Sequence, residues 1–462
     1  MFKRRQFLKM IAVAAAAPAS RAATFKNRAN AGFGPLKSDP QQILDLPKGF
    51  SYEVISRQGE EMDDGLLVPA RHDGMAAFTG RGGETLLVCN HENAARYQHM
   101  GPFGAGLERL EKIDRDKLYD YGKGTTPGTG GTTTIVYDTR SRTRKRIHLS
   151  LAGTEINCAG GPTPWGSWLS CEEIFRDPGA QFEWGAMAVR EQKHGYVFEV
   201  TAASDGLAEP LPIRAMGRFE HEAAAVDPAT GIVYLSEDKW RSLWYRYLPK
   251  VPGQLARGGR LQAMAIKDQP QFDTRNWKNS DRLPVGSVLE TSWVDLEDPD
   301  VAENDLRFRG RDKGATLFAR GEGLCFADGE VFLAATIGGR MHLGQVFSYR
   351  PSPAEGTADE QSKPGRLTLV AESGNDSLLQ HADNLSMSPW GDLVICEDAP
   401  DHCGLVGLTA DGRQYPIADN AYTRSELAGI CFSPDGSTMF VNIQYRGITL
   451  AITGPWSVVR NG

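Results

Sequence analysis

The side chains best suited to chemistry in this sequence are acidic residues that recur in pairs, together with one cysteine in a glycine-rich segment. The acidic sets are Asn90-His91-Glu92, Glu172-Glu173, Glu237-Asp238 and Glu397-Asp398. Cys158 lies in Asn157-Cys158-Ala159-Gly160-Gly161, a backbone-permissive segment in which a thiolate can reach a metal. Carboxylate oxygens suit hard ions such as calcium, whereas a thiolate calls for a softer or transition metal such as iron. The residue types therefore indicate a mixed metal site, although any single acid here is as readily a solvated strand end.

A lone arginine lies close to this acidic chemistry. Arg320 stands two residues before Glu322 in Ala319-Arg320-Gly321-Glu322-Gly323. A guanidinium beside metal-binding carboxylates is placed to grip an oxyanion through two parallel hydrogen bonds. The alternative is a salt bridge between Arg320 and a neighbouring glutamate.

A repeated hairpin pattern accounts for the spacing of these residues. Each copy has a small or acidic position, an apolar run of four to six residues, a glycine-bearing turn and a second apolar run, which is hairpin chemistry. Recurrence at irregular spacing is typical of a β-propeller, and six copies predict an all-β, six-bladed propeller with inserted loops and short helices; an uncounted seventh blade stays open. The copies are 72–92, 157–173, 221–238, 321–339, 383–398 and 426–444.

Propeller geometry places one residue of each copy at the central channel, just before the first apolar run. These residues are Asp73, Cys158, Glu222, Glu322, Asn384 and Gly429. Carboxylates that converge on one axis repel each other unless cations hold them. The pattern therefore predicts a metal site on the propeller axis.

Composition excludes several other classes. Of 462 residues, 40% are hydrophobic and 24% charged, and 51 Gly with 26 Pro favour many turns over long helices. The net charge of −7 argues against a nucleic-acid partner. No apolar run reaches the ~18 residues of a membrane helix, so no stable membrane anchor is expected. The sequence has no HExxH motif, and it has no GxSxG, P-loop or GxGxxG unit in a convincing context.

The N-terminus predicts export. Residues 1–22 combine a basic segment, a short apolar stretch and a small-residue cleavage pattern. Arg4-Arg5, followed by Gln6-Phe7-Leu8-Lys9, resembles the twin-arginine signal, whose substrates cross the membrane folded and often carry a cofactor. We expect a periplasmic or secreted protein in which residues 23–462 form one propeller domain.

Several motifs together resemble the PhoX family of secreted alkaline phosphatases. They occur in order along nearly the whole mature chain: 157–161 (NCAGG), 165–173 (WGSWLSCEE), 217–223 (GRFEHEA), 227–238 (DPATGIVYLSED), 320–323 (RGEG), 383–385 (DNL) and 396–398 (CED). The resemblance implies a six-bladed propeller whose channel holds two ferric ions (Fe³⁺) and several calcium ions (Ca²⁺). It implies hydrolysis of phosphomonoesters, with small phosphate esters as substrates. Separately, we expect the twin-arginine export machinery as a partner and a monomeric chain.

The resemblance also implies roles for individual residues. Cys158 becomes the thiolate ligand to iron, Arg320 the group that holds the phosphate, and Asn90 a second catalytic residue. Carboxylate ligands to the metals are implied at Glu92, Glu173, Glu222, Glu237, Asp238, Glu322, Asp383, Glu397 and Asp398. The alignment is looser at Asn90, Glu92, Glu237, Asp383, Glu397 and Asp398, because each motif offers adjacent candidates.

Two other functions remain open from the sequence. Six-bladed propellers with one central calcium serve as lactonases, and a non-catalytic propeller would use the acids as structural calcium ligands. The lactonase function leaves Cys158 and Arg320 without a task. Residues 93–130 read as a long insertion after the first hairpin that either caps the channel or decorates it.

Overall fold

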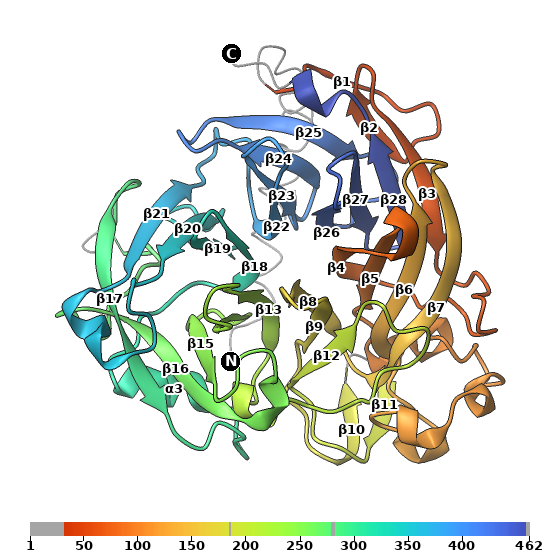
Figure 1. Ribbon diagram of the computed structural model, residues 1–462, viewed down its shortest axis with the longest axis horizontal. Coiled ribbons are helices and arrows are strands. Elements are labelled where there is room, and N and C mark those ends of the chain that lie inside the picture. The colour runs from red at the N-terminus through yellow and green to blue at the C-terminus, as the bar shows by residue number, and fades with distance from the viewer. Residues whose placement is uncertain (1–31, 184–185, 279–281, 459–462) are drawn as a thin grey trace, which may run out of the picture.

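The computed structural model describes residues 32–183, 186–278 and 282–458 and is all-β, with its sheets arranged around a central axis (Figure 1). The export signal expected at residues 1–22 lies outside the described residues. None of the helices in the described ranges has the length and apolar character that a membrane crossing requires.

All six predicted hairpins are present. Their turns follow from local sequence: Asp328 and Gly329 both have positive φ, 50° and 77°, between the paired residues Ala327 and Glu330, which is the two-residue turn that matches strand twist. The hairpins are β4 (His72–Thr79) with β5 (Thr85–His91), β8 (Asn157–Pro162) with β9 (Ser167–Glu172), β13 (His221–Val226) with β14 (Val233–Glu237), β18 (Gly321–Ala327) with β19 (Glu330–Ala335), β22 (Ala382–Met387) with β23 (Leu393–Glu397), and β26 (Leu427–Phe432) with β27 (Thr438–Ile443).

The first strand of each hairpin is innermost. These strands contact one another in the order β4, β8, β13, β18, β22 and β26, and β26 contacts β4, so they form a closed ring around the axis (Figure 1). A ring of radially arranged sheets is the propeller-like arrangement expected from the repeats.

Outer strands widen each sheet. β17 (Val288–Leu296) pairs with both β16 and β21 and thereby merges two neighbouring sheets into one of nine strands. β10 (Gly179–Glu183) and β11 (Ala186–Arg190) form a separate hairpin. The other outer strands are β6 (Gly130–Asp138), β7 (Thr143–Thr154), β12 (Val197–Thr201), β15 (Tyr245–Pro249), β16 (Gly259–Ile266), β20 (Gln345–Arg350), β21 (Arg366–Glu372), β24 (Gly404–Leu408), β25 (Gln414–Asn420) and β28 (Ile448–Thr453).

The first and last described strands lie in the same region of the ring. β3 (Ser51–Arg57) is the outer strand of the sheet formed by β26, β27 and β28. β1 (Leu36–Lys37) and β2 (Leu44–Pro47) extend the sheet of β22 to β25. Hydrogen bonds between β3 and β28, the last described strand, thus close the ring.

The apolar core lies between neighbouring sheets. In one cluster Leu169 of β9, Leu235 of β14 and Leu261 of β16 pack together, each at most 1% exposed. Burial of such side chains contributes roughly 1.5–3 kcal/mol each. This packing between sheets fixes the inner strands relative to the axis.

In the described parts of the chain the helices are short, and all but η9 lie in connections between strands. The one α-helix among these residues, α3 (Leu306–Asp312), follows β17. The 3₁₀ helices are η1 (Arg81–Gly83), η2 (Ala95–Met100), η3 (Leu110–Lys112), η4 (Arg115–Lys117), η5 (Gly122–Gly124), η6 (Arg214–Met216), η7 (Leu255–Arg257), η8 (Ala358–Ser362) and η9 (Trp456–Val458). Four of them, η2 to η5, lie in the long connection between β5 and β6, where the sequence predicted an insertion.

A buried ionic network supports the second hairpin. Glu155 accepts hydrogen bonds from Arg176, at 2.7 Å, and from Arg190, and all three side chains are about 1% exposed. Burial alone would raise the pKa of Glu155, but the two guanidinium charges hold it below the usual value. The backbone N–H of Glu155 donates to Glu172 at 3.0 Å, so the network fixes the end of β9.

This network predicts a large stability cost on truncation. Glu155→Ala leaves two buried guanidinium groups without their counter-charge and should lower the free energy of unfolding by about 3–5 kcal/mol. Asp205→Ala, which removes the exposed partner of Arg146, is the matched control and should cost less than about 1 kcal/mol. Urea unfolding measures both; equal costs would show that the buried network adds nothing beyond a surface pair.

Candidate active site

Every inner strand carries an irregularity of the same kind at the same place. In each hairpin, two inner-strand residues stand opposite one residue of the partner strand; in β4, Asp73 and Gly74 lie opposite Asn90. Such a bulge bends a strand and re-aims a side chain. The first bulge residues are Asp73, Cys158, Glu222, Glu322, Asp383 and Gly429.

This register corrects the sequence prediction in one hairpin. Asp383, not Asn384, takes the first bulge position of β22. The amide of Asn384 donates to the carboxylate of Asp383 at 3.0 Å and accepts from the backbone N–H of Gly429 at 2.7 Å. Asn384 therefore links two inner strands, while Asp383 faces the axis.

The second strands separate the members of each acidic pair. The first acid of each pair lies opposite an inner-strand residue in the β-ladder. Its carboxylate accepts hydrogen bonds from segments of the same chain next to the hairpin. Glu237 accepts from Leu243 N at 3.3 Å and Tyr245 Oη at 2.9 Å, and Glu397 accepts from Gln380 N at 2.7 Å and Gly404 N at 3.1 Å. Glu237 and Glu397, predicted as metal ligands, thus lie outside the axial cavity and hold backbone instead.

Asn90 is also engaged in structure. Its Nδ2 donates to the carbonyl oxygens of Cys158, at 3.2 Å, and Ala159, at 2.6 Å, and its Oδ1 accepts from Trp168 and Ser170. Ser236, at the equivalent position of β14, likewise donates to the carbonyl of Glu322 at 2.6 Å. The predicted catalytic Asn90 therefore does not line the axial cavity; it positions the strand that carries Cys158.

The remaining predicted residues come together in one cavity of about 330 Å³ at the start of the inner strands. We call it the axial cavity. Nine carboxyl side chains and Cys158 line it, against three guanidinium groups. Its lining consists of Arg71, Asp73, Glu92, Cys158, Glu173, Glu222, Asp238, Arg320, Glu322, Asp383, Asp398, Ala399, Pro400, Arg424, Ser425, Glu426 and Gln444.

Three groups within this lining bring potential ligand atoms within 4.8 Å of one another. They are Cys158 with Glu173 and Glu222, Asp73 with Glu92 and Glu426, and Glu222 with Glu322 and Asp383. The first group combines a sulfur donor with oxygen donors, and the other two offer oxygen alone. This donor chemistry fits a thiophilic transition metal beside hard cations.

The electrostatics of the axial cavity favour either protonated carboxyl groups or bound cations. Burial, and then the negative charge of neighbouring carboxylates, raises the pKa of Asp383 to about 8 and that of Glu222 and Glu322 well above the usual range. Burial, followed by Glu222 and Glu173, also raises the pKa of the Cys158 thiol. The raised pKa values favour the protonated forms of these groups, whereas bound cations would stabilise their ionised forms.

Arg320 enters the axial cavity from a left-handed turn. Its φ is 50°, and its backbone N–H donates to Lys239 O at 2.9 Å. Its Nε and Nη2 each donate to Asp238 at 2.6 Å, and Nη2 lies 3.0 Å from Glu322. Burial alone would lower the pKa of Arg320, but Glu322 and Asp238 raise it, so the group stays charged. The salt bridge that the sequence left open is therefore present.

Several polar residues of the axial cavity were not predicted from the sequence: Arg71, Arg424, Ser425, Glu426 and Gln444. Arg71 stands two residues before Asp73, as Arg320 stands two before Glu322, and it has the same left-handed backbone, with φ of 49°. It donates to Glu92 at 2.9 Å through Nε. The position of an arginine two residues before an acidic bulge residue could therefore have identified Arg71 from the sequence.

Glu426 compensates for a missing side chain on the sixth inner strand. Gly429 has φ of 65°, and a Cβ there would lie 2.3 Å from the carbonyl oxygen of Asp73. No larger residue fits that bulge position without a shift of backbone. Glu426, three residues earlier, supplies the carboxylate beside Asp73 and Glu92.

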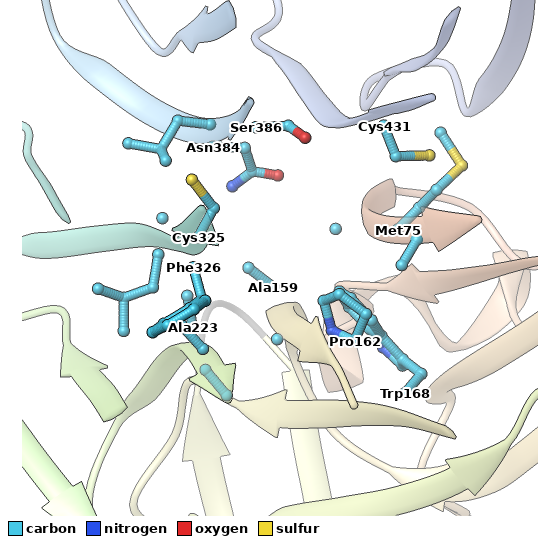
Figure 2. Close-up of a pocket in the computed structure, with 18 of the residues that line it drawn as sticks. Met75, Ala159, Pro162, Trp168, Ala223, Cys325, Phe326, Asn384, Ser386 and Cys431 are labelled. Carbon is cyan, nitrogen blue, oxygen red and sulfur yellow. The ribbon is translucent and has the colours of Figure 1, made fainter. Parts of the chain in front are cut away.

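The other end of the channel is apolar. Residues that follow the bulges line a second cavity of about 360 Å³, with Met75, Cys325, Phe326 and Cys431 around it (Figure 2). Asn384 and Ser386 are among its few polar side chains (Figure 2). The polar chemistry therefore concentrates at the axial cavity.

A propeller-like ring with an acidic cavity on its axis defines a class of protein, the all-β proteins of propeller-like architecture. Within that class, the sequence profile of the family "Alkaline phosphatase PhoX" matches residues 31–447, and the chain belongs to this family. The family is one of metalloenzymes that hydrolyse phosphoesters.

One solved structure agrees with this fold. The chain is similar to Pseudomonas fluorescens PhoX in complex with vanadate, a transition-state analogue, with a TM-score of 0.65 and 19% identity over 92% of this chain and 98% of that one. A gluconolactonase from Xanthomonas campestris matches at a TM-score of 0.40 with 11% identity, covering 91% and 98%. Virginiamycin B lyase from Staphylococcus aureus matches at 0.37 with 11% identity, covering 87% and 99%. No curated protein sequence matches the chain significantly.

The raised carboxyl pKa values predict an unusual pH dependence for the ion-free protein. Between the ordinary value of 3.8 and about 8, Asp383 stays protonated when folded but ionises on unfolding, so stability falls as pH rises through this window. Chelator-treated protein should lose thermal stability between pH 5 and pH 8, and protein that keeps its cations should lose much less. A melting temperature that is flat or rising in the ion-free protein would contradict the charge cluster.

Proposed function

We propose that this protein hydrolyses phosphate monoesters in the axial cavity, with Fe³⁺ and Ca²⁺ held by the carboxylates and the Cys158 thiolate. Membership in the PhoX alkaline phosphatase family makes the chain a phosphoester hydrolase. The location of the active site is inferred from one observation: nine carboxyl groups and one thiol converge on a cavity that also contains arginine.

The donor sets divide the proposed ligands between two kinds of ion. Cys158, Glu173 and Glu222 suit iron, because they include a thiolate. The all-oxygen groups, Asp73 with Glu92 and Glu426 and Glu222 with Glu322 and Asp383, suit calcium. Bound cations would supply Lewis-acid polarisation of the phosphoryl oxygens and offset the negative charge of the cavity.

Arg320 is the proposed phosphate-binding residue. Among the described residues its Nε and Nη2 bind Asp238 and Glu322, while Nη1 makes no such contact and is available to a phosphoryl oxygen. Asp238 orients the guanidinium through two hydrogen bonds, so little side-chain entropy remains to be lost on substrate binding. The negative charges around it keep Arg320 protonated at alkaline pH.

We also propose the number of blades, the extent of the domain, the route of export and the oligomeric state. The six inner strands support a ring of six blades, with β17 bridging the third and fourth. Residues 23–462 would form one domain, exported folded by the twin-arginine route to the periplasm or the exterior and active as a monomer. The paired arginines at positions 4 and 5 support the route.

Substitution of Arg320 tests phosphate binding. Arg320→Ala should raise KM for 4-nitrophenyl phosphate by about 10- to 100-fold, because a charged hydrogen bond contributes roughly 1.5–3 kcal/mol, while metal content stays unchanged. Arg350→Ala removes an exposed guanidinium on β20 and should change neither quantity. Steady-state kinetics with elemental analysis decides: an unchanged KM, or loss of metal, would remove Arg320 from phosphate binding.

A pair of cysteine substitutions tests the thiolate ligand. Cys158→Ala should abolish bound iron and most phosphatase activity with the fold retained, since it removes the only sulfur donor of the axial cavity among the described residues. Cys171→Ala, which removes a buried thiol in the same apolar cluster, should keep both. If the Cys158 variant retains iron and activity, the proposed iron site is wrong.

A further inference from the structure

We propose that the connection between β5 and β6 builds a leaving-group subsite beside the axial cavity, and that this subsite favours phosphate esters with an aromatic leaving group. The inference rests on the proposed phosphatase function and adds a substrate class to it. It also assigns a role to the insertion that the sequence left without one.

A cavity of about 430 Å³, here called the side cavity, opens directly beside the axial cavity. The two share Arg71, Glu92, Glu173, Asp238 and Arg320 as lining residues. A phosphoryl group held by Arg320 can therefore direct its ester oxygen and leaving group into the side cavity.

The insertion provides an aromatic wall for the side cavity. Tyr97 belongs to η2, and its ring has the guanidinium carbon of Arg96 4.5 Å from its centroid and that of Arg71 5.3 Å away. Phe175, which follows β9, contributes a second ring, partly exposed. Rings of this kind bind other rings by stacked or edge-to-face contact.

The position of Tyr97 is fixed by packing and by backbone hydrogen bonds. Its side chain packs against a small apolar cluster of Ala94, Ile156 and Ile174. Ile156 N donates to Asn93 O at 3.1 Å, and Glu173 N donates to Ile156 O at 2.9 Å. The ring is thereby tied to the same segment that carries the proposed ligand Glu173, so it is held in place before substrate binds.

Charge in the side cavity favours a neutral ring over an anionic leaving group. Its lining contains four cationic side chains and four acidic ones. Lys239 lies 2.9 Å from Glu220, and Arg71 and Arg320 are paired with Glu92 and Asp238. Because these charges balance locally, an additional negative charge on the leaving group gains little binding free energy. The rings of Tyr97 and Phe175, with the apolar side chains behind them, therefore provide the selectivity for the leaving group.

Three substrates separate this inference from the proposed function: phenyl phosphate, ethyl phosphate and pyrophosphate. Each variant is compared with the wild type on each substrate, which cancels the intrinsic reactivity of the leaving group. Tyr97→Leu should lower kcat/KM for phenyl phosphate about three- to tenfold, the value of one aromatic contact, and leave the other two within about twofold. Tyr97→Phe keeps the ring and should restore the phenyl phosphate rate.

The other outcomes overturn the inference in distinguishable ways. An equal loss on all three substrates would make Tyr97 structural, and a loss confined to pyrophosphate would make the side cavity an anion subsite. No change with any substrate would exclude the subsite while leaving the phosphatase function intact. A wild type inactive on all three would overturn the proposed function together with the subsite.

Inhibition by phosphonates gives a second readout that does not depend on turnover. The Ki of phenylphosphonate should rise in Tyr97→Leu by the same factor as kcat/KM falls, and the Ki of methylphosphonate should not change. If both Ki values rise together, Tyr97 does not select the ring.

Discussion

Repulsion among acidic side chains that converge on one axis is the constraint on which the rest of the structure depends. Nine carboxyl groups and one thiol line a cavity that holds only three guanidinium groups. Burial adds to the cost, since it raises the pKa of Cys158 and of carboxyl groups such as Asp383. Such an arrangement is stable with its groups ionised only when cations offset the charge. The family to which the chain belongs, and the mixture of sulfur and oxygen donors, both agree with a metal centre there.

The fold meets this constraint by giving the same task to the same position in each hairpin. On the inner strands, a bulge turns one residue toward the axis, and the following residues line the apolar half of the channel. On the second strands, adjacent residues face opposite sides, so Glu237 holds a loop while Asp238 reaches the axial cavity. Arg71 and Arg320 reach the axial cavity from equivalent left-handed turns directly before β4 and β18. These two strands lie opposite each other in the ring. Backbone geometry, more than side-chain identity, thus selects the residues of the site.

This explains how far the sequence could predict the site. The six hairpins followed from apolar runs and turn residues, and Cys158, Glu222 and Glu322 followed from their place before those runs. A bulge shifts the register by one residue, however, and no local signal distinguished Asp383 from Asn384. The same uncertainty of one residue affected Glu237 and Glu397 beside Asp238 and Asp398. Glu426 was missed because it reaches the cavity from a loop, in compensation for Gly429.

The central claim is that cations, iron among them, occupy the axial cavity and are required for phosphatase activity. Elemental analysis by mass spectrometry of protein exported from a suitable host and purified without chelators tests it most directly, with activity on 4-nitrophenyl phosphate followed through chelation and reconstitution. The account predicts iron together with calcium, and activity that is lost and regained with the metals. Calcium without iron would remove Cys158 from the metal centre, and full activity in metal-free protein would contradict the account altogether.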